Sequence, residues 1–209
     1  MKNKVCGMRE PENIREVAAL KPDYLGFIFY ERSPRYAGNL DPDIWHELPA
    51  SIRKVGVFVN DNPETVLTTV RRYGLDIVQL HGDESPEICR RIRETCLVVK
   101  AVGIAAQEDL QRAVENYDGV CDWFLFDTRT PLYGGSGKPF DWEILNAYPG
   151  ITPFFLSGGI GPEDAERIAR LNLPALYAID LNSRFETAPG VKDAASLKTF
   201  IDNIKCKRI

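Results

Sequence analysis

The amino-acid sequence predicts an α/β fold, a (β/α)8 TIM barrel that forms a single domain over residues 1–209. Three observations support this prediction: eight short apolar runs recur from end to end, each is followed by a helical stretch or a turn, and the chain has 209 residues. Alternating strands and helices are typical of a parallel sheet. Eight units of about 25 residues fit a closed barrel better than an open doubly wound sheet, although the pattern alone allows both.

The predicted strands are short and almost continuously hydrophobic. They comprise Asn3–Cys6, Tyr24–Phe29, Lys54–Val59, Asp76–Leu80, Leu97–Val102, Asp122–Asp127, Pro153–Ser157 and Leu176–Asp180. Strands of this composition are expected where both faces of a sheet are covered. The sixth strand, with the run Trp-Phe-Leu-Phe, is too apolar to have one face in water.

Four predicted helices begin with a proline in the first turn and an acidic residue beside it, at Pro11, Pro63, Pro86 and Pro162. Proline costs a helix nothing there, because its missing N–H would have no partner, and the acid interacts favourably with the helix dipole. Residues 106–116 and 193–204 fit two further helices. The segments after the second and sixth strands are too short for long helices.

Charge and composition exclude several classes of partner. Acidic residues outnumber basic residues by 30 to 26, so no overall positive field would attract nucleic acid or anionic lipid. The sequence has no signal peptide and no run of about eighteen apolar residues, which predicts a cytoplasmic protein without a membrane partner. The five cysteines form no CxxC pair, and neither His46 nor His81 has a partner at ligand spacing, so neither disulfides nor a metal are expected.

Polar residues follow most of the apolar runs. Because active sites of such barrels lie at the carboxyl ends of the strands, these residues are the functional candidates. They are Cys6, Arg35, Asn60, Asp61, His81, Lys100, Asp127, Ser157, Gly158, Gly159, Asp180, Asn182 and Ser183. A thiol, a carboxylate, an arginine and small polar turns together suit proton transfer on an anionic substrate.

The motifs at these positions closely resemble the phosphoribosylanthranilate isomerase family over the whole chain. The resemblance rests on residues 4–8, 26–29 with 33–36, 55–60, 79–82, Asp127 with 133–138 and 140–142, 157–160, and 189–193. Each motif alone is a weak signal. Their order along a barrel of the right length is a strong one.

The resemblance implies an Amadori rearrangement of N-(5-phosphoribosyl)anthranilate in tryptophan biosynthesis, without a cofactor. An acid protonates the furanose ring oxygen as the ring opens, and a base removes the proton from the adjacent sugar carbon. By the family's pattern, Asp127 is the acid and Cys6 the base. A cysteine is more often a buried apolar residue, but Cys6 stands at a strand end against a glycine; as a base it needs positive charge nearby.

The resemblance also assigns the binding residues. Arg35 resembles the family's clamp for the anthranilate carboxylate, since a guanidinium can donate two parallel hydrogen bonds. The phosphate is expected between the turns after strands seven and eight, at Ser157, Gly158, Gly159, Asn182, Ser183 and Arg184. Asp180 and His81 are expected beside the substrate, and Gly135 and Gly137 are expected to let the sixth loop close over it.

One departure from the family pattern concerns the phosphate site. Many members carry Ser-Gly-Val before the glutamate of the eighth loop, whereas this chain has Ser183-Arg184-Phe185 before Glu186. Without this glycine, the loop has fewer backbone conformations open to it. Arg184 is expected to add a positive charge in exchange.

Two other functions remain open. ProFAR-type and dual-substrate isomerases perform the same rearrangement, but they use aspartates as both acid and base and consist of two similar halves, whereas this chain has Cys6 and one clear phosphate site. A barrel that binds a phosphorylated ligand without catalysis is the second alternative, since a fold does not fix a function. A monomer is the default expectation, and a homodimer stays open.

Overall fold

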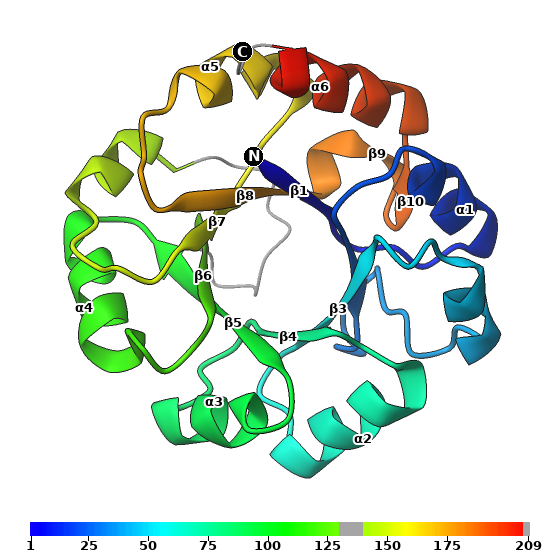
Figure 1. The fold of residues 1–209 in the computed structure, drawn as a ribbon, viewed down its shortest axis with the longest axis horizontal. Helices are drawn as coiled ribbons and strands as arrows, with labels where there is room; N and C mark the ends of the chain where they lie inside the picture. The colour runs from blue at the N-terminus through cyan, green and yellow to red at the C-terminus, as the bar shows by residue number, and fades with distance from the viewer. Residues whose placement is uncertain (130–139, 207–209) are drawn as a thin grey trace.

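The computed structural model describes residues 1–129 and 140–206. Eight parallel strands pair in chain order, and the last pairs with the first to close a barrel (Figure 1). The strands are β1 (Lys2–Val5), β2 (Tyr24–Ile28), β3 (Arg53–Phe58), β4 (Ile77–Leu80), β5 (Leu97–Ile104), β6 (Trp123–Thr128), β7 (Phe154–Leu156) and β8 (Leu176–Leu181). The predicted fold is confirmed, and every strand lies within two residues of its predicted bounds.

Helices surround the barrel (Figure 1). The α-helices are α1 (Pro11–Ala19), α2 (Pro63–Tyr73), α3 (Pro86–Arg93), α4 (Gln107–Tyr117), α5 (Ala165–Arg170) and α6 (Ala194–Cys206). Short 3-10 helices are η1 (Pro42–Glu47), η2 (Trp142–Ala147), η3 (Pro162–Asp164) and η4 (Ser183–Phe185). Proline starts α1, α2 and α3 as predicted, and the fourth predicted helix begins as η3 before it continues as α5. The connection after β2 contains only η1, which agrees with its predicted shortness.

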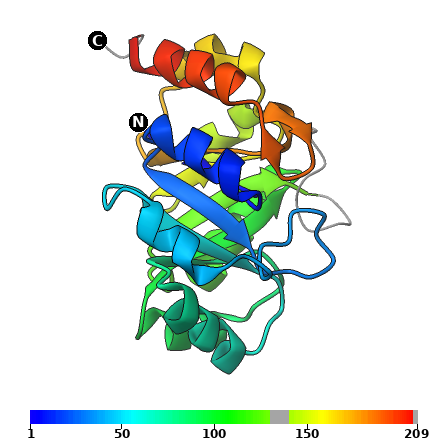
Figure 2. The same ribbon diagram turned by 90° about the vertical axis from the view of Figure 1, so that its right-hand side faces the viewer.

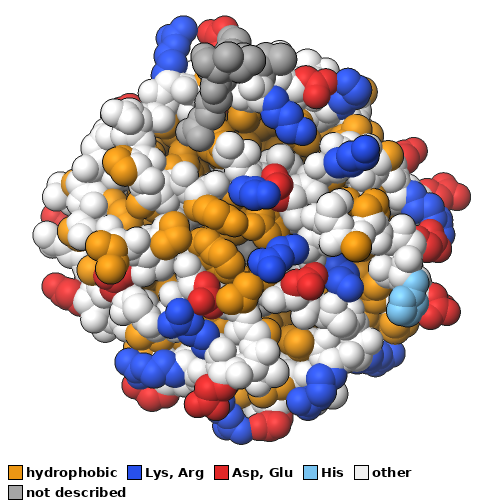
Figure 3. All heavy atoms as spheres, viewed as in Figure 1, with side chains coloured by type: hydrophobic (Ala, Val, Ile, Leu, Met, Phe, Trp, Pro, Cys, Tyr) orange, Lys and Arg blue, Asp and Glu red, His pale blue; other side chains and the backbone are white. Residues whose placement is uncertain are grey.

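The interior of the barrel is filled with side chains from the strands. One buried cluster draws on seven strands and consists of Tyr24, Val55, Ile77, Val99, Ala101, Leu125, Phe155 and Ala178. Leu97, Trp123 and Tyr177 pack against it near the starts of their strands. Figure 3 looks down the barrel from this end, where hydrophobic side chains gather at the centre. The barrel is therefore packed at its amino end, and the site must be sought at the carboxyl end.

A small hairpin stands at the carboxyl end of the barrel. Its strands, β9 (Glu186–Ala188) and β10 (Val191–Lys192), are antiparallel, and Gly190 between them has a φ of 85°. Figure 2 shows the hairpin at one end of the molecule and both termini at the other. The sequence did not predict this element, which carries two charged residues of the site. Within the described residues, no helix combines the length and apolar character that a membrane crossing requires.

Candidate active site

Cys6 directly follows β1 and is buried, with 3% of its surface exposed. Two glycines allow neighbouring chains to approach it. A Cβ at Gly26 would lie 2.7 Å from Cys6 Sγ, and a Cβ at Gly7, whose φ is 77°, would lie 2.7 Å from both Arg35 Cδ and Asn182 Oδ1. Only glycine fits such close contacts, so the thiol, the loop after β2 and the loop after β8 meet at one point.

A buried ion pair lies beside the thiol. Lys4 and Asp180 face each other on the paired strands β1 and β8, and Lys4 Nζ lies 2.9 Å from Asp180 Oδ1. Both side chains are almost fully buried, at 1% and 5% exposure. Asp180, which the sequence predicts beside the substrate, therefore has its carboxylate engaged by a lysine that the sequence pattern did not single out.

Charges around Cys6 act on its thiol in both directions. Burial raises the pKa of Cys6 above its ordinary value, and the carboxylate of Asp180 raises it further. The ammonium groups of Lys4 and Lys192 oppose this by favouring the thiolate. Burial prevails, so the pKa of Cys6 is raised and its thiol holds its proton at neutral pH.

Asp127 lies near the end of β6 and faces His81 from the loop after β4. His81 Nε2 is 3.5 Å from Asp127 Oδ2, and the amide of Thr128 donates to Asp127 Oδ1 over 2.7 Å. Gln79 Nε2 lies 2.7 Å from His81 Nδ1. Gln79 therefore holds the imidazole ring with its Nε2 towards the carboxylate.

A second buried ion pair fixes the loop that carries His81. Glu84 accepts hydrogen bonds from the amides of Asn60 (2.8 Å) and Gly82 (3.0 Å), and it pairs with Lys100 Nζ at 3.0 Å. Lys100 Nζ also donates to the carbonyl of Gly82 over 2.6 Å. The turn after β4 is therefore fixed by hydrogen bonds to both the amide and the carbonyl of Gly82.

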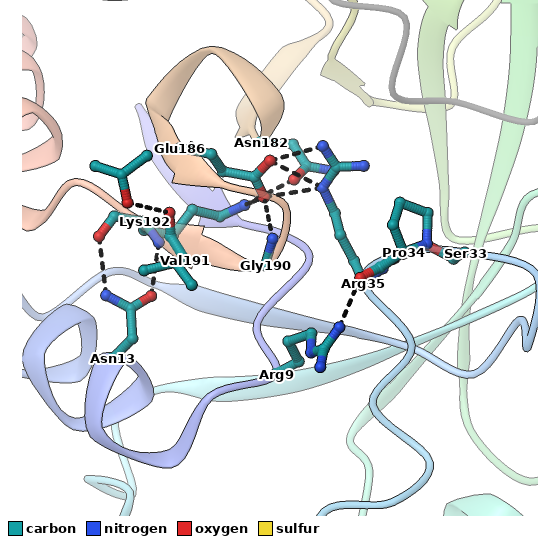
Figure 4. Close-up of polar contacts among 11 residues, drawn as sticks. Arg9, Asn13, Ser33, Pro34, Arg35, Asn182, Glu186, Gly190, Val191 and Lys192 are labelled. Carbon is teal, nitrogen blue, oxygen red and sulfur yellow. Dashed lines mark hydrogen bonds and ion pairs between the residues drawn. The ribbon is translucent and has the colours of Figure 1, made fainter.

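Arg35 forms a charged network with the β9–β10 hairpin (Figure 4). Its Nε and one terminal nitrogen donate to the two carboxylate oxygens of Glu186, over 2.8 and 2.6 Å. Lys192 Nζ also pairs with Glu186 and donates to Asn182 Oδ1 over 2.7 Å. Burial raises the pKa of Glu186, but Arg35 and Lys192 outweigh it and hold that pKa below its usual range. The arginine predicted to clamp a carboxylate thus already holds one.

The turn after β7 passes directly beside Asp127. Gly158 and Gly159 have φ values of 86° and 69°, which favour glycine. A Cβ at Gly158 would lie 2.6 Å from Thr128 Oγ1 and 3.1 Å from Asp127 Oδ1. Ser157, which precedes this turn, is buried. Any ligand bound at this turn would therefore lie next to the carboxylate.

The loop after β8 contains Asn182 and η4, which begins at Ser183. Arg184, whose side chain is 40% exposed, forms an ion pair with Glu163 of η3. This pair bridges the loops after β7 and β8. Its arginine is the residue at which the chain departs from the family pattern.

The remaining predicted site residues, Gly135 and Gly137, lie outside the described residues. Three other cysteines are free, and burial raises the pKa of Cys89 and Cys96 to about 11 and that of Cys121 to about 12. Cys89 and Cys121 are buried and Cys96 is half-buried, as expected of cysteines that pack as small apolar side chains.

Comparison with known proteins identifies the family. The family model described as N-(5'-phosphoribosyl)anthranilate (PRA) isomerase matches residues 3–203. The chain belongs to the PRA isomerase family. The resemblance seen in the motifs is confirmed: the chain is an enzyme with PRA isomerase activity in tryptophan biosynthesis, an Amadori-type intramolecular oxidoreductase.

Several PRA isomerases resemble this chain over almost its full length. The PRA isomerase of Parabacteroides distasonis is 52% identical over 204 residues, which cover 96% of this chain and 92% of that protein. A crystal structure of the enzyme from Thermotoga maritima covers 99% of both chains with a TM-score of 0.85 and 38% identity. Another structure describes monomers generated from that dimeric enzyme (TM-score 0.81, 35% identity, 99% of both chains). A further PRA isomerase structure (TM-score 0.81, 34% identity, 99% of both chains) is a complex with reduced 1-(o-carboxyphenylamino)-1-deoxyribulose 5-phosphate.

Proposed function

We propose that this PRA isomerase performs its two proton transfers with Asp127 as general acid and Cys6 as general base. One observation carries the proposal: the order of four groups across the carboxyl end of the barrel. Arg35 lies at Gly7, next to Cys6, and Gly158 lies against Asp127. The substrate has the same order of groups, with the anthranilate carboxylate and C1–C2 at one end and the ring oxygen and 5-phosphate at the other.

In this orientation each group meets the atom on which it acts. Asp127 gives a proton to the ring oxygen, the bond from C1 to that oxygen breaks, and the nitrogen lone pair forms the Schiff base. The Cys6 thiolate then takes the proton from C2, and the electron pair moves to C1=C2 to form an enolamine. Protonation at C1 and loss of the C2 hydroxyl proton give the ketone, so the reaction is an isomerisation. His81 Nε2 lies 3.5 Å from Asp127 Oδ2, so His81 is placed to stabilise the carboxylate left after the first step.

Arg35 is proposed to bind the carboxylate of the anthranilate ring. Glu186 engages Nε and one terminal nitrogen of Arg35. A guanidinium has five N–H donors in a fixed plane, so donors remain for a ligand. Glu186 therefore orients the group that receives the substrate.

The phosphate is proposed to bind between the turns after β7 and β8. Glycines at positive φ let backbone amides approach an anion closely. Ser157, Gly158 and Gly159 form one side of this site. Asn182, Ser183 and Arg184 form the other, and Arg184 supplies a charge that it shares with Glu163.

We infer further that the whole chain acts as one catalytic domain in the cytoplasm and binds a phosphorylated sugar substrate. The related enzyme of Thermotoga maritima is described as dimeric. A full-length relative with the same fold supports a homodimer for this chain over the monomer that the sequence suggests by default.

Steady-state kinetics of Cys6→Ala and Asp127→Asn tests the two assigned roles. Substrate fluorescence is lost on turnover, so its decay gives kcat and KM. We expect each variant to lower kcat by about 10²- to 10⁴-fold, the contribution of a positioned acid or base. Cys96→Ala, the same change at a cysteine outside the site, controls for the substitution and should retain kcat. If either site variant kept most of its kcat, the role of that residue would be wrong.

A further inference from the structure

Lys4 is a charged residue in the barrel interior that the mechanism above does not use. Its side chain is 1% exposed, and its only ion pair among the described residues is with Asp180. A buried ion pair costs more desolvation than an apolar pair of similar volume. The pair lies at the carboxyl end of β1, two positions before Cys6. Its location therefore calls for an explanation beyond stability.

The geometry brings Lys4 and Cys6 together. Residues two apart on a strand point to the same side, and Cys6 continues the line of β1 beyond Val5. A Cβ at Gly26 on β2 would lie 2.7 Å from Cys6 Sγ and 3.1 Å from Lys4 Cε. The thiol of Cys6 and the end of the Lys4 side chain thus both lie beside Gly26.

Charged groups face Cys6 from four elements. Of these groups, Lys4 is the one best placed to stabilise a thiolate, for the following reasons. Asp180 on β8 is an anion. Arg35 after β2 and Lys192 on β10 share the carboxylate of Glu186. Lys4 on β1 favours the thiolate by its positive charge, and after burial it has the largest effect on the pKa of Cys6.

We propose that Lys4, held in place by Asp180, is the positioning cation that stabilises the Cys6 thiolate for proton abstraction. The inference rests on the proposed role of Cys6 as the base. Although burial lowers the pKa of Lys4, Asp180 and Cys6 raise it above its ordinary value, so the ammonium is charged throughout the working range. Asp180 then positions Lys4, although its own negative charge disfavours the Cys6 thiolate.

This arrangement predicts opposite changes in two variants. Lys4→Met removes the cation and should raise the pKa of Cys6 by about 1–3, the usual effect of a nearby opposite charge. Asp180→Asn removes the anion and should lower the same pKa. The pKa is read by NMR titration of the chain labelled with ¹³Cβ-cysteine, with Cys6→Ser to assign the signal. Loss of packing alone would not move the pKa in opposite directions.

Kinetics provides the second readout. The acidic limb of kcat against pH should move upward in Lys4→Met, and kcat at neutral pH should fall about tenfold each time the pKa of Cys6 rises by about 1. The limb should move downward in Asp180→Asn. Lys4→Arg keeps the charge and should retain most of the wild-type profile. Lys100→Met is the matched control, because Lys100 and Glu84 form an equally buried pair on other strands; it should leave the pKa of Cys6 unchanged.

The outcomes separate this inference from the proposed function. An inactive Cys6→Ala variant, together with an unchanged Cys6 pKa in folded Lys4→Met, would overturn the inference alone. A change of the Cys6 pKa in the same direction in Lys4→Met and Asp180→Asn would also overturn it. An active Cys6→Ala variant would overturn the proposed function, and the role of Lys4 with it. If Lys4→Met does not fold, Asp180→Asn and Lys4→Arg still decide the question: the first must lower the pKa of Cys6, and the second must leave it unchanged.

Discussion

Each cation near the thiol is paired with a carboxylate. Lys4 pairs with Asp180, while Arg35 and Lys192 share Glu186. Two carboxylates thus neutralise most of the positive charge of three cations, although the substrate carries a carboxylate and a phosphate of its own. At the scale of single residues, binding must redistribute these pairs, because substrate anions compete with the protein's own.

Replacing Arg35 tests the carboxylate clamp. Arg35→Ala should raise KM about 10- to 100-fold, since a charge-assisted hydrogen bond contributes about 1.5–3 kcal/mol, and it should change kcat far less. Arg32→Ala, at an exposed arginine of the same loop, should leave KM within twofold. An unchanged KM in Arg35→Ala would rule out the clamp.

The raised pKa of Cys6 predicts the pH dependence of the enzyme. A base acts only when deprotonated, and burial raises the pKa of this thiol. Activity should therefore increase with pH throughout the neutral range, because the thiolate fraction grows until the pH passes the raised pKa. The measurement is kcat/KM from about pH 6 to 9.5, and a flat profile over that range would contradict the prediction.

The sequence predicted the two residues proposed to react but not the charges around them. Cys6 and Asp127 became candidates because each stands at the end of a recognisable apolar run, and the family resemblance implied the role of each. Lys4 was overlooked because a lysine in a strand is ordinarily expected to reach solvent, and its partner is 176 positions away. The available signal was its spacing from Cys6, which puts both side chains on one side of β1.

At the scale of elements, near-continuous apolar runs make the strands easy to predict, and proline with an adjacent acid marks three helix starts. The β9–β10 hairpin lacks such a signal. Its strands have three and two residues, and Glu186 and Lys192 resemble ordinary surface charges. Glu186 pairs with Arg35, which lies 151 positions earlier in the chain, so no local pattern could reveal this contact.

The start of α4 provides an element-scale prediction. Asp109 accepts hydrogen bonds from the amides of Ala105 (2.8 Å) and Ala106 (3.0 Å) and pairs with Arg129. Burial raises its pKa, but these partners outweigh it and hold the pKa below its ordinary value. Asp109→Asn should reduce the free energy of unfolding by about 1–3 kcal/mol at pH 7.

The sign of its pH dependence follows from the lowered pKa. The contribution of Asp109 is fully present above the pKa of an unfolded aspartate, near 3.9, and is lost as the pH falls through the lower pKa of the folded chain. The difference between wild type and Asp109→Asn, measured by urea unfolding, should therefore shrink below about pH 4. Glu108→Gln, at an exposed acid in the same turn, should show a smaller effect at pH 7. A difference independent of pH would contradict the account.

At the scale of the whole molecule, closure of the sheet joins the first and last strands. The pairing of β1 with β8 aligns Lys4 with Asp180. It also brings the loops that follow these two strands next to each other. Because closure requires all eight strands, we expect the chain to unfold in one transition with coincident changes in fluorescence and circular dichroism. Two separated transitions would contradict the single domain.

The proposed homodimer is also a property of the whole molecule. Light scattering coupled to gel filtration should give twice the mass of the 23.5 kDa chain at micromolar concentration. The mass of one chain at that concentration would favour the monomer and leave the catalytic proposal unaffected, because the residues of the site all come from one barrel.

The central claim is that one substrate lies across the site from Arg35, past Cys6 and Asp127, to Gly158. A crystal structure with reduced 1-(o-carboxyphenylamino)-1-deoxyribulose 5-phosphate tests it most directly. We expect the carboxylate on Arg35, the phosphate at Gly158, C2 about 3.5 Å from Cys6 Sγ, and the C4 oxygen within hydrogen-bond distance of Asp127. A phosphate bound at Arg35, or Cys6 out of contact with C2, would contradict it.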